Sequence, residues 1–199
     1  MFRRWIVVTL AALTTGCGYN KIQQLDERAQ AYQGQIEVQL QRRADLIPNL
    51  VQTVKGYAQH EEAVFTQVAN ARSGLLNAVK SGDAEQMATA NATMTGALGR
   101  LLAVVESYPQ LKADQGFLRL QDELAGTENR IAVSRNDYNG AVNEYNAYIR
   151  QFPAVITAKV TGAKPRKYFT AAPGTTEPPK VDFSRPATPT PAPPPTKTP

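Results

Sequence analysis

The sequence predicts an all-α protein, an elongated antiparallel four-helix bundle followed by a disordered, proline-rich C-terminal tail. Between residues 19 and 152, apolar residues recur at steps of three and four, which is the spacing of one helix face. Only Pro48 and Pro109 interrupt that stretch, and no part of it alternates between polar and apolar residues for long enough to form a sheet. Ten of the chain's fourteen prolines lie from Pro173 onward, and such a segment is unable to bury a core.

The first sixteen residues are predicted to be a signal peptide. Arg3 and Arg4 precede an apolar run at residues 5–13, which is shorter than the roughly 20 residues of a spanning helix, and Cys17 follows where bacterial lipoproteins are cleaved and acylated. Because Cys17 is the only cysteine, it has no internal disulfide partner, and lipidation accounts for it. The alternative is an uncleaved segment that lies in the membrane. Both alternatives anchor the chain in the bacterial cell envelope and place it outside the cytoplasm, in the periplasm of a Gram-negative cell.

The charge of the processed chain argues against nucleic-acid binding. Removal of the signal peptide would lower the formal net charge from +5 to +3, because Arg3 and Arg4 leave with it. So small a basic excess does not predict a nucleic-acid partner, and an extracytoplasmic location argues further against one.

Residues 17–152 are predicted to form the bundle. The apolar stripe of the first helix consists of Ile22, Leu25, Ala29, Tyr32, Ile36 and Leu40, and that of the second consists of Leu50, Val54, Tyr57, Val64, Val68, Ala71, Leu75 and Val79. Pro48 is expected to open the second helix, with Asp45 as a candidate N-cap three residues before it. The sequence leaves open whether the chain turns a tight corner there or only kinks.

The boundaries of the third and fourth helices carry clearer signals. Ser81, Gly82 and Asp83 indicate a helix stop followed by a new N-cap. Pro109 is expected to close the third helix, because the residue before a proline disfavours helical backbone, and Asp114 is a candidate N-cap of the fourth. Small residues dominate the third helix, which favours close packing in the centre of the bundle or against the second helix.

After the bundle, residues 153–184 are predicted to form a strap that folds back along it and buries Phe152, Tyr168 and Phe169. The basic residues of this segment include Lys159, Lys164, Arg166 and Lys167. The alternative is that this basic, aromatic stretch contacts anionic lipid or a partner. Residues 185–199 are the predicted disordered tail.

Two polar clusters contain the candidate binding residues. The first consists of Arg42, Arg43, Asp45 and Asn49, and the second consists of Glu128, Arg130 and Arg135. Glu128 and Arg135 are seven residues apart and share a helix face. We expect these two residues to pair across the bundle with Arg42, Arg43 or Asp45. Such pairing would be structural, and a ligand site is the alternative.

Four stretches together resemble the LemA family in order and spacing: RRADLIPNLVQTVKGYAQHE, ENRIAVSRNDYNGAVNEYN, FPAVITAKVTGAKPRKYF and PKVDF. The resemblance runs from about residue 19 to residue 183. It implies a mostly α-helical, membrane-anchored protein outside the cytoplasm, with an antiparallel helical bundle as its core, and it implies no established activity. Family members commonly have a membrane-spanning N-terminal anchor, from which the short apolar run before Cys17 departs.

Residues that enzymes use are not found in recognisable settings. His60 is the only histidine, and its neighbours Glu61 and Glu62 do not have the spacing of a metal site. Acylation of Cys17 would leave no thiol nucleophile, and no serine lies in a nucleophile motif. We therefore expect no enzyme activity, no catalytic residues, no metal and no cofactor.

The predicted function is that of a non-enzymatic scaffold or adaptor, which holds the bundle on a membrane and binds an unknown envelope protein. The alternative is a lipoprotein that contacts the cell wall, or peptidoglycan, through its C-terminal segments. Deletion of residues 185–199 would separate the two, because loss of wall association is expected only for the alternative.

Overall fold

The computed structural model describes the backbone of residues 2–170 and the side chains of residues 18–170. Helices account for all of its regular structure, and no strand occurs in the described range, so the all-α prediction is confirmed. The helices are α1 (Phe2–Lys55), α2 (Glu62–Ser81), α3 (Ala84–Val105), α4 (Pro109–Lys112), α5 (Gln115–Tyr148) and α6 (Ala154–Thr161).

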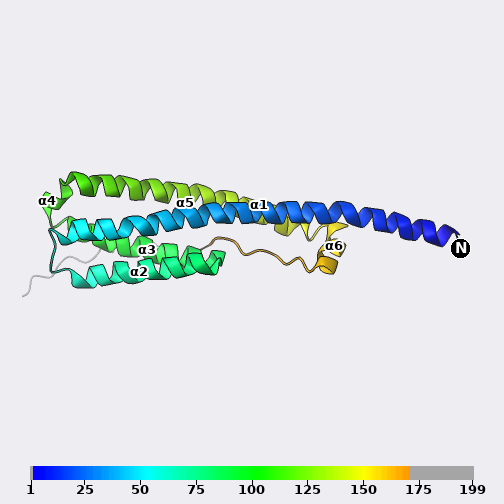
Figure 1. Cartoon of the computed structure of the whole chain (residues 1–199), viewed down its shortest axis with the longest axis horizontal. Coiled ribbons are helices and arrows are strands. Elements are labelled where there is room, and N and C mark those ends of the chain that lie inside the picture. Colours follow the sequence, from blue (N-terminus) through cyan, green and yellow to red (C-terminus); the bar gives the residue numbers. More distant parts are fainter. Residues whose placement is uncertain (1, 171–199) are drawn as a thin grey trace, which may run out of the picture.

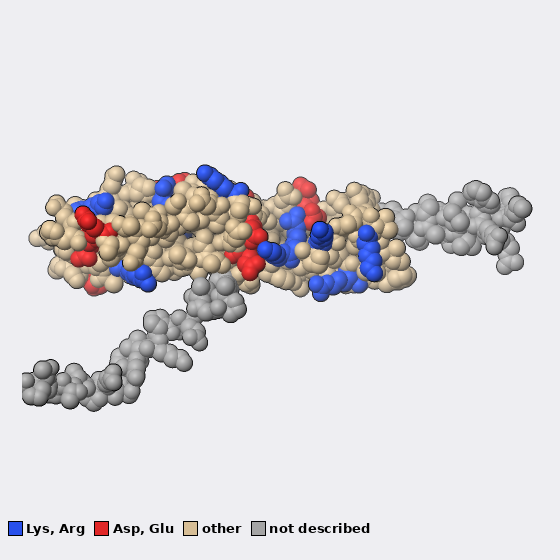
Figure 2. All heavy atoms as spheres, turned by 90° about the horizontal axis from the view of Figure 1, so that it is seen from below, with Lys and Arg blue, Asp and Glu red and all other residues tan. Residues whose placement is uncertain are grey.

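The molecule is a rod whose length is set by α1 and α5, which lie antiparallel and side by side (Figures 1 and 2). The 54 residues of α1 correspond to about 80 Å at 1.5 Å per residue. The α2–α3 hairpin packs against the half of this pair that is farther from the N-terminus, and α6 packs against α1 in the nearer half (Figure 1). Four long helices thus form the bundle, with α4 and α6 as short additions.

Two separate cores follow from this arrangement. The larger one fills the four-helix section, and its fully buried side chains include Ile36, Leu40, Leu50, Leu75, Met87, Met94 and Leu101. The smaller one joins α1, α5 and α6 near the N-terminal end, and it consists of Ile22, Leu25, Tyr145, Ile149 and Ala158. Most of the residues predicted to form apolar stripes lie in one of these cores, because helical periodicity reports the buried face directly.

The predicted boundary between the first two helices is wrong. α1 runs through Pro48 without a break, and it ends at Lys55, ahead of Gly56. Pro48 has no N–H to donate to the carbonyl of Ala44, and the buried carbonyl instead accepts a 2.7 Å hydrogen bond from Nε of Arg72 on α2. A donor from a neighbouring helix therefore replaces the bond that proline removes, and Asp45 is not an N-cap.

This arrangement makes a testable prediction for Arg72. Replacement of Arg72 with methionine is expected to lower the free energy of unfolding by about 1–2 kcal/mol, because the Ala44 carbonyl loses its donor. Pro48→Ala restores a backbone N–H at that place, so Arg72→Met should cost clearly less in the Pro48→Ala background. Urea unfolding followed by circular dichroism measures both costs, and equal costs in the two backgrounds would contradict this role of Arg72.

The predicted boundaries at Gly82–Asp83 and at Asp114 are confirmed, but α3 already ends at Val105, and Pro109 opens the short helix α4 instead of closing α3. The carboxylate of Asp83 accepts hydrogen bonds from the backbone N–H groups of Glu85 and Gln86, and Gly82 before it has a φ of 65°, the left-handed conformation that ends α2. The carboxylate of Asp114 likewise accepts a 2.8 Å bond from the N–H of Phe117 at the start of α5. The Ala-rich α3 packs against α2, as its composition predicted.

The strap follows its predicted course only in part. Phe169 is buried in the larger core, but Tyr168 and Phe152 are exposed, so the predicted burial of these two residues is wrong. The reason is that the strap begins with Pro153 and α6, which packs on α1 through its small residues Ala154, Thr157 and Ala158 and leaves Phe152 outside the core. The predicted tail, residues 185–199, lies outside the described residues, and cleavage before Cys17 stays a prediction.

Within the described residues, no helix combines the length and the apolar character that crossing a bilayer would need.

Candidate functional site

The most unusual polar residue in the core is Arg43 of α1. Its side chain is only 5% exposed and reaches between α3 and α5. Its Nη1 donates a 2.7 Å hydrogen bond to Oδ1 of Asn91 and also pairs with the carboxylate of Glu128, while its Nη2 donates to Oγ1 of Thr95 at 3.1 Å. Nε of Arg43 is buried and has no hydrogen-bond partner in the structure. One guanidinium thus ties α1 to both α3 and α5.

The charge of Arg43 is held in an unfavourable place. Burial lowers the pKa of the Arg43 guanidinium, and the nearby Glu128 carboxylate acts in the opposite direction by stabilising the charged form. The Glu128 side chain is 46% exposed, so the ion pair has one buried partner and one partner that still contacts water. The cost of burying the guanidinium is therefore offset mainly by Glu128 and the two neutral acceptors on α3.

The sequence correctly predicted that Glu128 pairs with the cluster around Arg43. Arg135 does not take part in this pairing, contrary to the prediction, and the structure does not bring the other candidates to Arg43 either. Arg42 pairs with Glu123 at 3.8 Å on an exposed surface, and Asp45 accepts a hydrogen bond from Gln41 one turn earlier on the same helix. The remaining candidates, Asn49, Arg130 and Arg135, are exposed, and no ion pair of the two arginines is seen among the described residues.

Sequence reasoning missed the α3 side of this cluster. Asn91 and Thr95 are four residues apart, and Leu98 and Leu102 continue the same helix face. The sequence signal for these two residues was that a polar pair, Asn91 and Thr95, extends the apolar stripe of α3. Between α3 and α5 this face borders a mainly apolar pocket of about 360 Å³, and Arg43 and Glu128 are among the residues that line it.

Two asparagines of α5 hold the strap. Each side chain bonds to both the backbone N–H and the backbone carbonyl of one strap residue, as a neighbouring β-strand would. Asn146 accepts from the N–H of Arg166 at 2.8 Å and donates to the carbonyl of the same residue at 2.9 Å. Asn139 forms the same pair of bonds with Phe169, at 2.8 Å and 3.3 Å. The two asparagines lie seven residues apart, so they occupy one face of α5 two turns from each other. The hydroxyl of Tyr138 adds a bond to the carbonyl of Lys167.

Ion pairs fix Arg166 and Lys167, the first two residues of the held segment. Nε and Nη2 of Arg166 donate to the two carboxylate oxygens of Asp26 at 2.6 Å and 3.0 Å, and this bidentate contact raises the pKa of Arg166. Nζ of Lys167 lies 2.9 Å from Asp83 and 3.4 Å from Glu85 at the start of α3. The strap therefore connects α1, α5 and the α2–α3 hairpin.

We expect the stability of the protein to depend on pH through Asp83, where the strap meets the start of α3. The hydrogen bond from Lys167 is the main cause that lowers the pKa of Asp83, and the N–H of Gln86 adds to it. The resulting stability is complete above the ordinary aspartate pKa of about 4 and is lost as pH falls through the lowered pKa. Asp83→Asn keeps an N-cap but loses the ion pair, so its thermal midpoint should lie below that of the wild type at pH 7 and approach it toward pH 2. A difference in midpoint that stays constant over this range would contradict the prediction.

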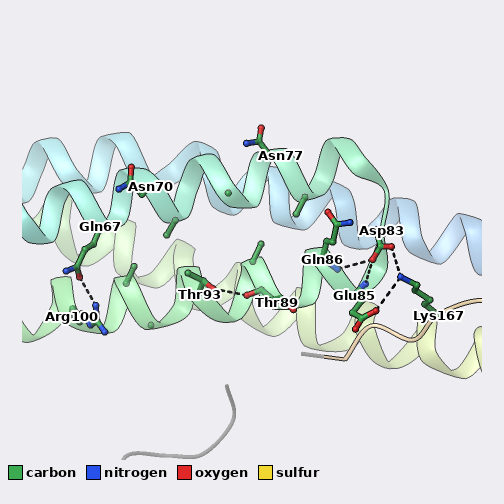
Figure 3. Close-up of a pocket in the computed structure, with 16 residues that line it drawn as sticks. Gln67, Asn70, Asn77, Asp83, Glu85, Gln86, Thr89, Thr93, Arg100 and Lys167 are labelled. Carbon is green, nitrogen blue, oxygen red and sulfur yellow. Dashed lines mark hydrogen bonds and ion pairs between the residues drawn. The ribbon is translucent and has the colours of Figure 1, made fainter. Parts of the chain in front are cut away.

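A groove of about 1040 Å³ lies between α2 and α3, and the close-up shows it with α1 behind it (Figure 3). Small residues line its centre, among them Ala71, Gly74, Ala78, Ala90, Gly96 and Ala97, and uncharged polar residues flank them, namely Gln67, Asn70, Asn77, Gln86, Thr89 and Thr93. Charged residues lie only at its ends, where Arg100 donates to Gln67 and Lys167 pairs with Asp83. In residues 18–170 no group of three or more potential metal ligands gathers.

An elongated helical bundle with a strap bonded to one long helix is the class of protein that these observations define. Residues 32–183 match the LemA family, and the chain belongs to this family.

Three magnetosome proteins are similar to the chain over most of its length. MamQ 1 and MamQ 2 of Paramagnetospirillum magneticum (strain AMB-1) are each 30% identical over 178 residues, which cover 78% of this chain and 65% of the relative. MamQ of Magnetospirillum gryphiswaldense (strain MSR-1) is 28% identical over 174 residues, which cover 76% of this chain and 64% of the relative. The chain thus spans a little under two thirds of the length of these relatives.

Proposed function

We propose that this LemA-family protein is a membrane-anchored, non-enzymatic scaffold that faces outside the cytoplasm and binds another envelope protein along its α2–α3 groove. The observation that carries the proposal is the continuity of α1. One helix leads from the predicted anchor segment through the whole bundle, so no flexible joint separates the anchor from the groove.

The continuity of α1 sets the height of the groove above the membrane. Gln33 of α1 donates a 2.9 Å hydrogen bond to the carbonyl of Gly82, which marks the near end of the hairpin. Gln33 is sixteen residues after Cys17, or about 25 Å along the helix, and the far end of α1 at Lys55 is about 55 Å away. The protein would therefore hold its partner at a fixed distance from the lipid surface.

The composition of the groove supports a protein partner. Small residues allow a helix or an extended segment to approach closely, and the amides and hydroxyls at the edges offer hydrogen bonds to a partner without charge selection. The relatives also favour a non-enzymatic role, since their names refer to the magnetosome and not to a reaction.

The anchor is tested by the intact mass of the protein purified from its membrane, beside a Cys17→Ala variant. A mass that lacks the first sixteen residues and includes acyl groups, lost in the variant, is the expected result. An unprocessed mass in both proteins would mean that the N-terminal segment itself is the anchor.

The scaffold role is tested by photo-crosslinking in cells of the native host. A photoreactive amino acid at Asn77 or Thr93, within the groove, is expected to yield one discrete crosslinked protein of the envelope. The same amino acid at Val133, an exposed position on α5, is the matched control and should not yield that product. Identical products from all three positions, or none from the groove, would contradict the proposal.

A further inference from the structure

α6 buries its small residues and exposes large apolar ones, which is the reverse of what is expected of a helix that packs on a core. Its buried residues are the small ones, Ala154, Thr157 and Ala158. Its large residues Ile156 and Val160 point outward and are 52% and 83% exposed, and Phe152 just before the helix is 81% exposed. Ile156 and Val160 are four residues apart and share one face of α6, and Phe152 lies in the turn just before the helix; we call these three residues the α6 patch. An exposed apolar patch of this kind marks an interaction surface.

The α6 patch lies beside the predicted anchor. α6 packs so closely on α1 that a Cβ added at Gly18 would lie 3.2 Å from Oγ1 of Thr157. Gly18 directly follows Cys17 in the sequence. Any bilayer that holds the segment before Gly18 therefore comes within reach of the α6 patch.

The surroundings of the α6 patch are basic. Residues 145–170 contain no aspartate or glutamate, and they include Arg150, Lys159, Lys164, Arg166 and Lys167. Arg166 and Lys167 are used in ion pairs with α1 and α3, whereas no ion pair of Arg150, Lys159 or Lys164 is seen among the described residues. The view in Figure 2 shows lysines and arginines gathered at this end of the rod, with fewer acidic residues than at its middle.

We propose that the α6 patch is a second membrane contact, which inserts Phe152, Ile156 and Val160 into the interface of a bilayer rich in anionic phospholipid while Arg150, Lys159 and Lys164 contact the lipid phosphates. Apolar residues surrounded by lysine and arginine are the composition of interfacial membrane-binding helices. The inference rests on the proposed membrane anchoring, since it deepens the way in which the rod meets the lipid. Two contacts at one end, α1 and the α6 patch, would fix the tilt of the rod and thus the direction in which the α2–α3 groove faces.

The basic residues favour lipid over the other possible occupants. A second copy of this chain would bring the same basic surface against itself, and like charges would then repel. A purely apolar protein partner would leave Arg150, Lys159 and Lys164 without a role. An anionic bilayer satisfies both the apolar and the basic residues, and the anchor already brings it to this place.

The test uses the full chain with Cys17→Ala and one new cysteine that carries an environment-sensitive fluorophore. The label is placed at Val160 in one variant and at Val133, an exposed valine of α5, in the control. Both variants keep the same N-terminal segment, so a difference between them reports local contact and not attachment as such. In vesicles of phosphatidylcholine with about one quarter phosphatidylglycerol and a quencher lipid, the Val160 label should be quenched at least twofold more than the Val133 label.

Three outcomes decide the proposal. Quenching at Val160 that weakens in pure phosphatidylcholine, and in the triple variant Arg150→Gln, Lys159→Gln, Lys164→Gln, supports it. Equal quenching at the two labels overturns it. A blue shift at Val160 that grows with protein concentration and needs no vesicles also overturns it, because a second copy then covers the patch. The triple variant should keep its thermal midpoint, since all three side chains are exposed.

The fate of the anchor is measured separately. The intact mass of the native chain decides whether Cys17 is acylated. The two labelled variants share the Cys17→Ala change and the same N-terminal segment, so the difference in quenching between them does not report acylation. Equal quenching with an acylated native chain would reject the α6 contact alone, whereas quenching at Val160 with an unprocessed chain would reject the lipid anchor alone.

Discussion

Replacement of Arg43 with alanine is expected to lower the free energy of unfolding by about 3–5 kcal/mol, the cost of breaking a buried ion pair by removing one partner. The change removes a side chain that bonds to Asn91, Thr95 and Glu128, and it opens a cavity where three helices meet. Urea unfolding followed by circular dichroism gives the free energy, and Arg42→Ala is the matched control. Because Arg42 contacts Glu123 only at 3.8 Å on an exposed surface, its loss should cost less than about 1 kcal/mol.

Changes at Glu128 separate the ion pair from the packing. Glu128→Gln leaves the guanidinium buried without a counter-charge, and a loss of about 1–3 kcal/mol is expected. The double variant Arg43→Met, Glu128→Gln removes both charges and keeps most of the volume, so it should be more stable than Arg43→Ala by at least about 1 kcal/mol. Equal costs for Arg42→Ala and Arg43→Ala would show that Arg43 does not join the three helices.

The sequence allowed α5 to be predicted almost completely, because local signals and packing agree there. Asp114 caps its start, and its buried stripe runs from Phe117 to Ile149 with the polar residues Thr127 and Ser134 within it. The path of α1 through Pro48 was not predictable in the same way. The donor that replaces the lost backbone bond is Arg72, and only the tertiary packing of α2 on α1 brings it to the Ala44 carbonyl.

In the candidate site too, local sequence signals predicted one part, and the other part depends on tertiary packing. Glu128 could be paired with the cluster around Arg43 because both lie beside apolar stripes, but sequence spacing did not reveal that Arg43 is buried while Arg42, one residue away, is exposed. One residue is a rotation of about 100° on a helix, so the choice depends on the exact orientation of α1 against α3 and α5. The sequence also did not predict which face of α6 is exposed. An apolar residue such as Val160 reads the same in the sequence whether it is buried or exposed.

The motif ENRIAVSRNDYNGAVNEYN gains a structural explanation from the strap. Its asparagines Asn139 and Asn146 each hold one residue of the strap through both backbone groups. Asn143 lies between them and makes only a 3.4 Å contact with the hydroxyl of Tyr168. Among these three asparagines of the motif, two hold the strap through both backbone groups and Asn143 does not, which offers a controlled comparison within a single helix.

Asn146→Ala is expected to lower the free energy of unfolding by about 2–3 kcal/mol, because it removes two hydrogen bonds and leaves the N–H and the carbonyl of Arg166 without partners. Loss of this clamp should also loosen the ion pair of Arg166 with Asp26, which ties the strap to α1. Asn143→Ala is the matched control, and its expected cost is below about 0.5 kcal/mol.

Hydrogen exchange distinguishes a loosened strap from a generally weakened bundle. In Asn146→Ala the amides of Arg166 and Phe169 should exchange faster by a factor of ten or more, while amides in the middle of α3 should change only as far as global stability falls. Asp26→Asn should accelerate the same strap amides to a smaller extent, since it removes the ion pair but keeps the asparagine clamp. If Asn146→Ala accelerates exchange equally throughout the rod, the asparagine contributes to the core as a whole and the strap is not an independently held element.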